Sequence, residues 1–173
     1  AAHTAQSVHM GAHDALRIMS DQVVVDLRAA LKELVENAID ANPNRIDIVL
    51  KRHGADALEV HDDGAGIPAE QLEQLALRHT TSKLRRFDDL GQLRSYGFRG
   101  EALSSLAALS TLSVSTRTAA DAVGTLVTFE RNGAVASRTA VAREVGTTVT
   151  VTNLFEPFPV RRSELLRNAR LEQ

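Results

Sequence analysis

Glu33 and Asn37, four positions apart, are the first residues whose types and spacing could do chemistry. They lie in LRAALKELVENAID, residues 27–40, which separates into an apolar and a polar face when read as a helix. The polar arc spans roughly 100° and places the Glu33 carboxylate beside the Asn37 amide, because residues four apart are neighbours on a helix surface. Taken alone, such a stretch is more often an amphipathic helix with a solvated acidic face.

Two glycine-bearing motifs downstream favour a nucleotide site instead. In SYGFRGEAL, residues 95–103, Gly97 and Gly100 allow close approach of the backbone, and the helix that begins there offers N–H groups to an anion. In DDGAG, residues 62–66, Asp62 follows a predicted strand, where a buried carboxylate accepts a hydrogen bond from an amino group such as that of adenine. The plainer alternatives are a glycine-marked helix start and an Asp-Gly turn. Nucleotide hydrolysis needs phosphates wrapped by backbone N–H groups, a magnesium ion and a base for water.

Other nucleotide and hydrolase motifs are excluded. Gly64, Gly66 and Ala69 fit the pattern G-x-G-x-x-G/A, but the two carboxylates before the first glycine would repel a pyrophosphate. No second parallel βα unit follows, as a dinucleotide-binding fold requires. The P-loop pattern G-x-x-x-x-G-K-[ST], the nucleophile elbow G-x-S-x-G and the zinc motif H-E-x-x-H are all missing from the sequence.

The first half of the chain predicts the elements that position these motifs. Ser20 or Asp21 is expected to cap a helix that runs to Asp40 and stops before Pro43. Alternating apolar residues predict two strands of a hairpin, 45–51 and 57–61. A further helix is expected to begin at Pro68 and to end at about Leu77.

The second half predicts an antiparallel sheet. Residues 78–94 are polar and form a long binding loop or a disordered segment, and the helix EALSSLAAL ends near Leu109. Four strands follow, with a tight turn at Asn132-Gly133 between the middle two: 111–117, 123–131, 134–142 and 147–153. The order of elements predicts an α+β, two-layer α/β sandwich with a mixed, mostly antiparallel sheet and helices on one face.

Composition sets the broad limits. The 173 residues are 43% hydrophobic, which is enough for one domain, expected over residues 16–160 after a flexible leader at 1–15. Residues 161–173 form a basic helix expected to lead into a second domain. There are no cysteines, so disulfides and thiolate metal sites are excluded, and the net charge of −2 gives no global argument for binding nucleic acid. No apolar run approaches the ~18 residues of a membrane span, and a soluble intracellular protein is the default expectation.

Five motifs in a fixed order resemble one known family. ELVEN, DDGAGI, TTSK, GFRGEAL and GTTV, between residues 33 and 149, resemble the GHKL (Bergerat) ATPase superfamily and, within it, the MutL family of DNA mismatch-repair proteins. The resemblance covers about residues 16–168, and GFRGEALSSL with RHTTSK is specific to MutL proteins. SDQVVVDL is similar to the eukaryotic PMS-type branch. Asp21 and Asp63 depart from the pattern, since they stand where glycine and asparagine are common.

The resemblance implies roles for particular residues. Glu33 would be the general base for the attacking water, and Asn37 would bind Mg²⁺ through its amide oxygen, a neutral ligand that adds no charge beside a triphosphate. Asp62 would recognise adenine, with Thr147 assisting through water. Further contacts to the nucleotide, partly from a lid over the phosphates, would come from Gly64, Gly66, Thr81, Ser82, Lys83, Arg99, Gly100, Glu101, Ala102 and Leu103.

The implied function is slow, Mg²⁺-dependent ATP hydrolysis in mismatch repair. ATP would drive N-terminal dimerisation and DNA clamping in the nucleus, together with a MutL-homologue partner subunit in a heterodimer and without a membrane. In this family a lysine from a following domain reaches the γ-phosphate, so hydrolysis by this chain alone is expected to be weak. The alternative is a non-hydrolysing, nucleotide-gated interaction module of the same superfamily.

DNA contact is expected to be weak and non-specific. Its candidates lie in the polar loop and in the C-terminal helix, although a solvated basic face explains them as well: Lys83, Arg85, Arg86, Arg161, Arg162, Arg167 and Arg170.

Overall fold

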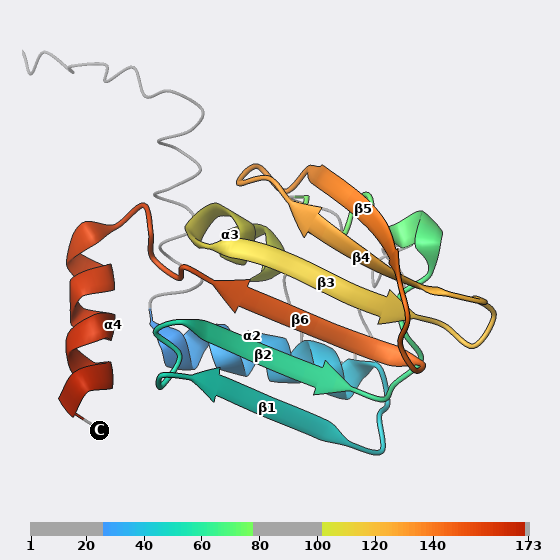
Figure 1. Cartoon of the computed structure of the whole chain (residues 1–173), viewed down its shortest axis with the longest axis horizontal. Helices are drawn as coiled ribbons and strands as arrows, with labels where there is room; N and C mark the ends of the chain where they lie inside the picture. Colours follow the sequence, from blue (N-terminus) through green and yellow to red (C-terminus); the bar gives the residue numbers. More distant parts are fainter. Residues whose placement is uncertain (1–25, 78–101, 172–173) are drawn as a thin grey trace, which may run out of the picture.

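A six-stranded antiparallel sheet forms one layer of the fold, and helices cover one of its faces (Figure 1). The computed structural model describes residues 26–77 and 102–171. The strand order is β1-β2-β6-β3-β4-β5. In chain order the strands are β1 (Ile46–Lys51), β2 (Ala57–Asp62), β3 (Thr111–Arg117), β4 (Gly124–Phe129), β5 (Val135–Val141) and β6 (Gly146–Thr152). The predicted two-layer sandwich is confirmed, and all pairings among the described strands are antiparallel.

Residue alternation in the central strands builds the core. In β6, Thr147, Val149 and Val151 are buried while the residues between them are partly exposed, because successive side chains point to opposite faces. Val149 pairs with Val60 of β2 on one side and with Val114 of β3 on the other. Helices α2 (Leu27–Asp40) and α3 (Ala102–Leu109) lie against this apolar face.

Helix α2 begins later than the sequence predicts. Asp26 is its N-cap, and its Oδ1 accepts a hydrogen bond from the Ala29 N–H at 2.7 Å. The prediction that Ser20 or Asp21 caps this helix is therefore wrong, because a third capping residue stands nearer the apolar stripe. The end is as predicted: Ala41 closes the helix and Asn42 turns to a positive φ of 52° before Pro43.

The segment after Pro68 is not the predicted α-helix. Ala69–Gln71 is a short 3₁₀ helix, and turns follow up to Leu77. Its hydrogen bonds join residues three apart, such as Gln71 N–H to Pro68 C=O at 2.9 Å and Gln74 N–H to Gln71 C=O at 3.2 Å. The tighter winding buries Leu72 and Ala76 in the core.

The Asn132-Gly133 turn is confirmed in detail. Gly133 adopts a positive φ of 86°, and the Asn132 Oδ1 accepts a hydrogen bond from the Ala134 N–H at 3.0 Å. The Glu130 N–H donates to the Ala134 C=O at 2.8 Å and closes the loop between β4 and β5. The four predicted strands of this half match the observed ones to within two residues at each end.

Helix α4 (Pro159–Leu171) stands beside the end of the sandwich in Figure 1. Phe158 and Leu165 pack against the core cluster, and Ala169 is buried. None of the helices among the described residues has the length and apolar character to cross a bilayer. The predicted leader at 1–15, the polar loop at 78–94 and the start of the GFRGEAL motif lie outside the described residues.

We expect the side chain of Leu34 to hold α2 on the sheet. It is fully buried, so Leu34→Ala should lower the free energy of unfolding by about 2–5 kcal/mol through lost apolar contact and a residual cavity. Val160→Ala, at a strongly exposed position of α4, should change it by less than about 0.5 kcal/mol. Urea denaturation followed by circular dichroism measures both, and equal effects would contradict this packing.

Candidate functional site

The two chemically suggestive residues of α2 lie on its partly exposed flank. Glu33 and Asn37 have intermediate exposure, whereas Ala30, Leu34 and Ala38 are buried on the sheet side. A neighbouring acidic residue of the same helix, Glu36, pairs with Lys32 at 2.8 Å. The helix thus places a carboxylate and an amide one turn apart at the border of the core, as predicted.

Asp62 occupies the last position of β2, opposite Thr147 in β6. Its Oδ1 accepts a hydrogen bond from the Gly64 N–H at 3.0 Å. Burial raises the pKa of Asp62 above its usual value, although hydrogen bonds from the Gly64 and Thr147 backbone and the charge of Arg143 act in the opposite direction. A half-buried carboxylate at a strand end is therefore kept at an electrostatic cost, which suggests a function.

A pair of threonine hydroxyls supports the Asp62 region from within the core. The Thr116 hydroxyl donates to the Gly146 C=O at 3.1 Å and accepts from the Ile67 N–H at 2.8 Å. The Thr147 hydroxyl lies 3.1 Å from it. Because the Thr116 proton is already used, Thr147 donates to Thr116 and keeps its lone pairs for another donor, such as a water.

Thr116 was missed by the sequence reasoning. It is buried in β3 beside Thr147, which strand alternation and pairing of β3 with β6 would have indicated. Its partners are up to 49 residues away in the chain, so no local motif marks it.

The Asp62 loop is locked to the C-terminal end of α2. A Cβ at Gly64 would lie 2.7 Å from both the Cβ and the carbonyl oxygen of Ala41, so only glycine fits there. The Ala65 N–H donates to the same carbonyl at 3.3 Å. Since Ala41 is one helical turn beyond Asn37, this contact brings the Asp62 loop next to the polar flank of α2.

Asp63 has a structural part in the same arrangement. Its Oδ1 accepts hydrogen bonds from the Asn44 N–H at 2.7 Å and the Arg45 N–H at 2.9 Å. The residue that departs from the family pattern thereby fastens the link between α2 and β1 to the loop.

Gly66 completes the loop with a positive φ of 77°. A Cβ there would fall on the backbone of Arg117 and Thr118, so the glycine permits close packing against the end of β3. This packing accounts for the glycine without a ligand, and the role of Gly64 and Gly66 in making room for a nucleotide stays a prediction.

The predicted phosphate-contacting residues are described only in part. Ala102 is buried at the start of α3, and Leu103 packs against the core cluster. Any contact of these two with a phosphate would therefore use backbone N–H groups. The other candidates lie outside the described residues: Thr81, Ser82, Lys83, Arg99, Gly100 and Glu101.

The basic residues of α4 are partly engaged within the protein. The Arg161 guanidinium lies 5.4 Å from the ring centre of Phe158 and 5.8 Å from that of Phe155. Arg162 has one buried guanidinium nitrogen, whereas Arg167 is exposed. The side chain of Arg170 lies outside the described part. The predicted basic face is thus reduced among the described side chains.

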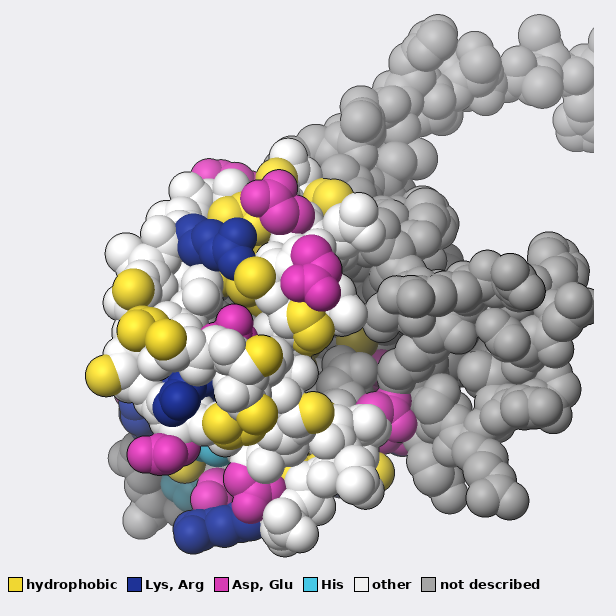
Figure 2. Space-filling model, turned by 90° about the vertical axis from the view of Figure 1, so that its right-hand side faces the viewer, with side chains coloured by type: hydrophobic (Ala, Val, Ile, Leu, Met, Phe, Trp, Pro, Cys, Tyr) yellow, Lys and Arg dark blue, Asp and Glu magenta, His cyan; other side chains and the backbone are white. Residues whose placement is uncertain are grey.

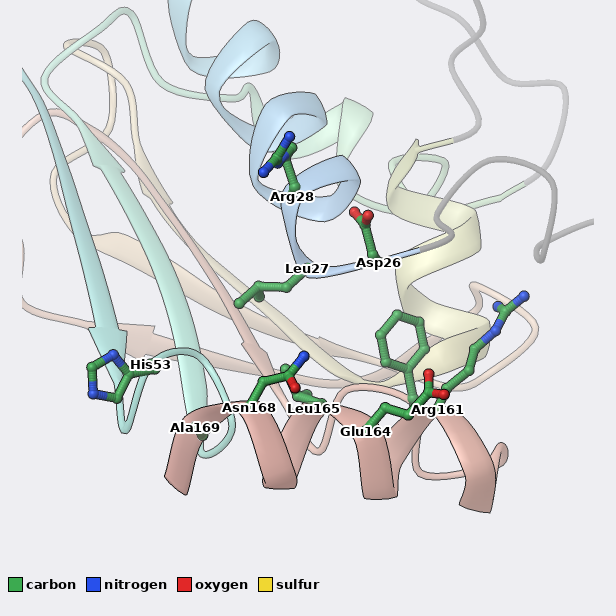
Figure 3. A pocket seen from close by; sticks show the side chains of 10 residues that line it. Asp26, Leu27, Arg28, His53, Arg161, Glu164, Leu165, Asn168 and Ala169 are labelled. Atoms are coloured by element: carbon green, nitrogen blue, oxygen red, sulfur yellow. The ribbon is translucent and has the colours of Figure 1, made fainter. Parts of the chain in front are cut away.

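A separate pocket of about 350 Å³ lies between the N-terminus of α2, the β1–β2 turn and α4 (Figure 3). Its lining includes the apolar Leu27 and Leu165 and side chains of both charges, such as Arg28 and Glu164. None of the predicted nucleotide residues that the structure describes lines it.

The opposite end of the sandwich, where β2 ends and β6 begins, faces the viewer in Figure 2. Acidic and apolar side chains are interspersed on the coloured surface, and the basic ones form separate spots. This view therefore shows no continuous basic patch on the described residues that would attract DNA.

Comparisons with known proteins agree with this geometry. Residues 25–153 match the family described as histidine kinase-, DNA gyrase B-, and HSP90-like ATPase. The chain is 51% identical over 156 residues to the DNA mismatch repair protein PMS1 of Arabidopsis thaliana and 49% identical to the human mismatch repair endonuclease PMS2. These alignments cover 90% of this chain but 17% and 18% of the relatives, so the chain spans less than a fifth of their length.

Solved structures give the same result. The crystal structure of the N-terminal domain of a DNA repair protein superposes with a TM-score of 0.79 at 41% identity, covering 95% of this chain and 47% of that one. The MutL ATPase domain of Aquifex aeolicus, in complex with ADP, gives 0.58 at 26% identity, covering 82% of this chain and 50% of that one. The chain therefore belongs to the histidine kinase-, DNA gyrase B- and HSP90-like ATPase family, as an ATPase domain of the MutL/PMS type.

The raised pKa of Asp62 predicts a pH dependence of stability. A carboxyl whose pKa is higher in the folded than in the unfolded protein binds its proton more tightly when folded, so it costs stability at neutral pH and less as pH falls toward that pKa. The unfolding free energy of the wild type, relative to Asp62→Asn, should therefore increase between pH 7 and pH 5. Urea denaturation of both proteins at the two pH values measures this. A wild-type unfolding free energy that falls on acidification, relative to that of Asp62→Asn, would contradict the burial of the carboxylate.

Proposed function

We propose that this chain binds ATP with Mg²⁺ between α2 and the Asp62 loop and hydrolyses it slowly, as part of a mismatch-repair protein. The observation that carries the proposal is the contact of Gly64 and Ala65 with Ala41. It places a half-buried carboxylate beside the helix flank that holds Glu33 and Asn37. The MutL relative in complex with ADP, and the ATPase family to which the chain belongs, support a nucleotide as ligand.

Asp62 is proposed to recognise the adenine. Its Oδ1 already accepts one hydrogen bond from Gly64 N–H, and a carboxylate has further lone pairs for the exocyclic amine of the base. Thr147 donates inward to Thr116, so its oxygen remains able to accept from a water that bridges to the base. Both side chains are positioned by the β2–β6 pairing and not by a loop.

Glu33 and Asn37 are proposed to act on the phosphate end. The donor set fits Mg²⁺, because an amide oxygen is a hard ligand and Mg²⁺ takes its other ligands from phosphates and water. When bound, the metal would neutralise charge that develops on the phosphates. Glu33 would hold the attacking water by accepting its hydrogen bond and would take its proton. Gly64, Gly66 and the segment with Thr81, Ser82, Lys83 and 99–103 would enclose the nucleotide.

The wider role rests on the relatives. We propose that ATP binding drives N-terminal dimerisation and DNA clamping in the nucleus, in a heterodimer with a MutL-homologue subunit. Those relatives are named as mismatch-repair proteins of eukaryotes, and a non-hydrolysing role for the pocket has no observation in its favour.

Removal of the proposed base should separate binding from turnover. Glu33→Ala should bind ATP with near wild-type affinity but lose about 10²–10⁴-fold in hydrolysis rate, because the water loses its proton acceptor. Binding is measured on this chain by calorimetry. Turnover is measured on a version that also carries the following domain implied by the family resemblance.

Glu36→Gln is the matched control. It removes a carboxylate from the same helix, but that carboxylate pairs with Lys32, so turnover should stay close to wild type. Equal turnover in Glu33→Ala and wild type would show that Glu33 is not the base.

Loss of the proposed metal ligand should change how ATP affinity depends on Mg²⁺. Asn37→Ala should bind ATP more weakly in the presence of Mg²⁺, and the affinity that Mg²⁺ adds in the wild type should be lost. Titration with ATP in excess Mg²⁺ and in EDTA measures the difference. A variant that retains the full Mg²⁺ enhancement would exclude Asn37 as a ligand.

A further inference from the structure

β1 is an edge strand with an unusual surface. Three consecutive large apolar residues of β1 are exposed, Ile48 at 46%, Val49 at 38% and Leu50 at 42%. Among the described strands, β1 stands at one end of the sheet and pairs on one side only, with β2. Natural edge strands are usually short, charged or covered, because their free N–H and C=O groups can pair with another chain.

The β1–β2 register shows which groups of β1 face outward. The Asp63 N–H donates to the Arg45 C=O at 3.3 Å, so the backbone of Arg45 bonds toward β2. Backbone groups alternate along an antiparallel strand, and the groups of Asp47, Val49 and Lys51 therefore also bond to β2. The N–H and C=O groups of Ile46, Ile48 and Leu50 point the other way, away from β2 and toward the open edge of the described sheet.

The same register assigns the side chains to faces. Ile48 lies opposite Val60 and Leu50 opposite Leu58, so both are on the helix-covered face. Val49 lies opposite Glu59 on the other face, which it shares with Asp47 and Lys51. One face of the edge thus carries two exposed aliphatic side chains, Ile48 and Leu50, and the other carries an acid and a base on either side of a valine.

We propose that β1 pairs antiparallel with β1 of a second copy of this chain, across a two-fold axis at Val49. In this register Ile48 lies opposite Leu50 of the second copy, and both present outward backbone groups for hydrogen bonding. Asp47 lies opposite Lys51 of the second copy, and the two-fold axis repeats this pair. The strand is therefore complementary to itself in backbone, apolar contact and charge.

Charge favours this register over the one in which the two-fold axis lies one residue away, at Ile48. A two-fold axis at Ile48 also matches the outward backbone groups, but it places Arg45 opposite Lys51 and leaves Asp47 opposite Val49. Like charges directly opposite each other are destabilising, whereas opposite charges and aliphatic pairs are favourable. Lys51 already contacts Glu59 at 2.5 Å, and its ammonium has three donors, so it can accommodate a second carboxylate.

The small size of β1 makes this association weak. Stable interfaces bury about 1,200 Å² or more in total, and pairing of six-residue strands offers less than that. The pairing is concentration-dependent and does not involve the nucleotide site. Its failure would leave the proposed ATPase function untouched.

Cysteine cross-linking tests the register directly. The chain has no cysteine, so Val49→Cys introduces a single thiol. A non-hydrogen-bonded antiparallel pair has a Cα–Cα distance of about 4.5 Å, which lies within the range of a disulfide. Under mild oxidation without nucleotide, Val49→Cys should form a covalent dimer on a non-reducing gel several-fold faster than Thr139→Cys. Thr139 is exposed on β5, the opposite edge of the sheet. Equal rates for the two variants would overturn the proposal.

Charge reversal in mixed samples provides the second test. Val49→Cys chains carrying Asp47→Lys place two Lys–Lys pairs in the homodimer, and those carrying Lys51→Glu place two Asp–Glu pairs. A mixture of the two variants restores both opposite-charge pairs in the mixed dimer. The mixed disulfide should therefore exceed both homodimers beyond the statistical half, once circular dichroism has shown that both variants are folded. A statistical distribution would overturn the register.

Discussion

The close contact between the loop after β2 and the C-terminal end of α2 is the constraint on which the candidate site depends. Only a residue without a side chain fits at Gly64, because Ala41 occupies the space that a Cβ would need. On one side the contact fixes Asp62 against β6, and on the other it fixes the distance from the carboxylate to the polar flank of α2. A substitution that separates the loop from the helix would separate the two halves of the site without removing any of its polar groups.

Strand pairing and hydrogen bonds position this contact. Asp62 and Thr147 are a cross-strand pair where β2 ends and β6 begins, and the hydroxyl of Thr116 connects Thr147, Gly146 and the loop at Ile67. Asp63 fastens the other end of the loop to the α2–β1 link through two backbone N–H groups. The site is preorganised on a strand end and a helix. Its electrostatic cost is visible in the raised pKa of Asp62, which is consistent with a carboxylate retained for binding and not for stability.

Local patterns in the sequence were enough for most of the fold. Alternation predicted β1 to β6 to within two residues, and Asn132-Gly133 predicted its turn because that dipeptide is a strong local signal for a hairpin. The misses occurred where local signals were ambiguous. Ser20, Asp21 and Asp26 are all of residue types that favour an N-cap, and in the structure Asp26 caps α2. The 69–77 segment has helical residues but winds more tightly as Leu72 and Ala76 enter the core.

For the site, the sequence identified Asp62, Glu33 and Asn37 as residues of interest, but not the contacts that relate them. The role of Thr116 and the anchoring by Asp63 depend on partners between 18 and 49 residues away, which no local motif encodes. The most direct test of the account is a crystal structure with adenylyl imidodiphosphate and Mg²⁺. The account predicts the adenine amine on the Asp62 carboxylate, the metal on the Asn37 amide oxygen and Glu33 facing the γ-phosphate. A nucleotide in the pocket beside α4, or Glu33 turned into bulk solvent, would contradict it.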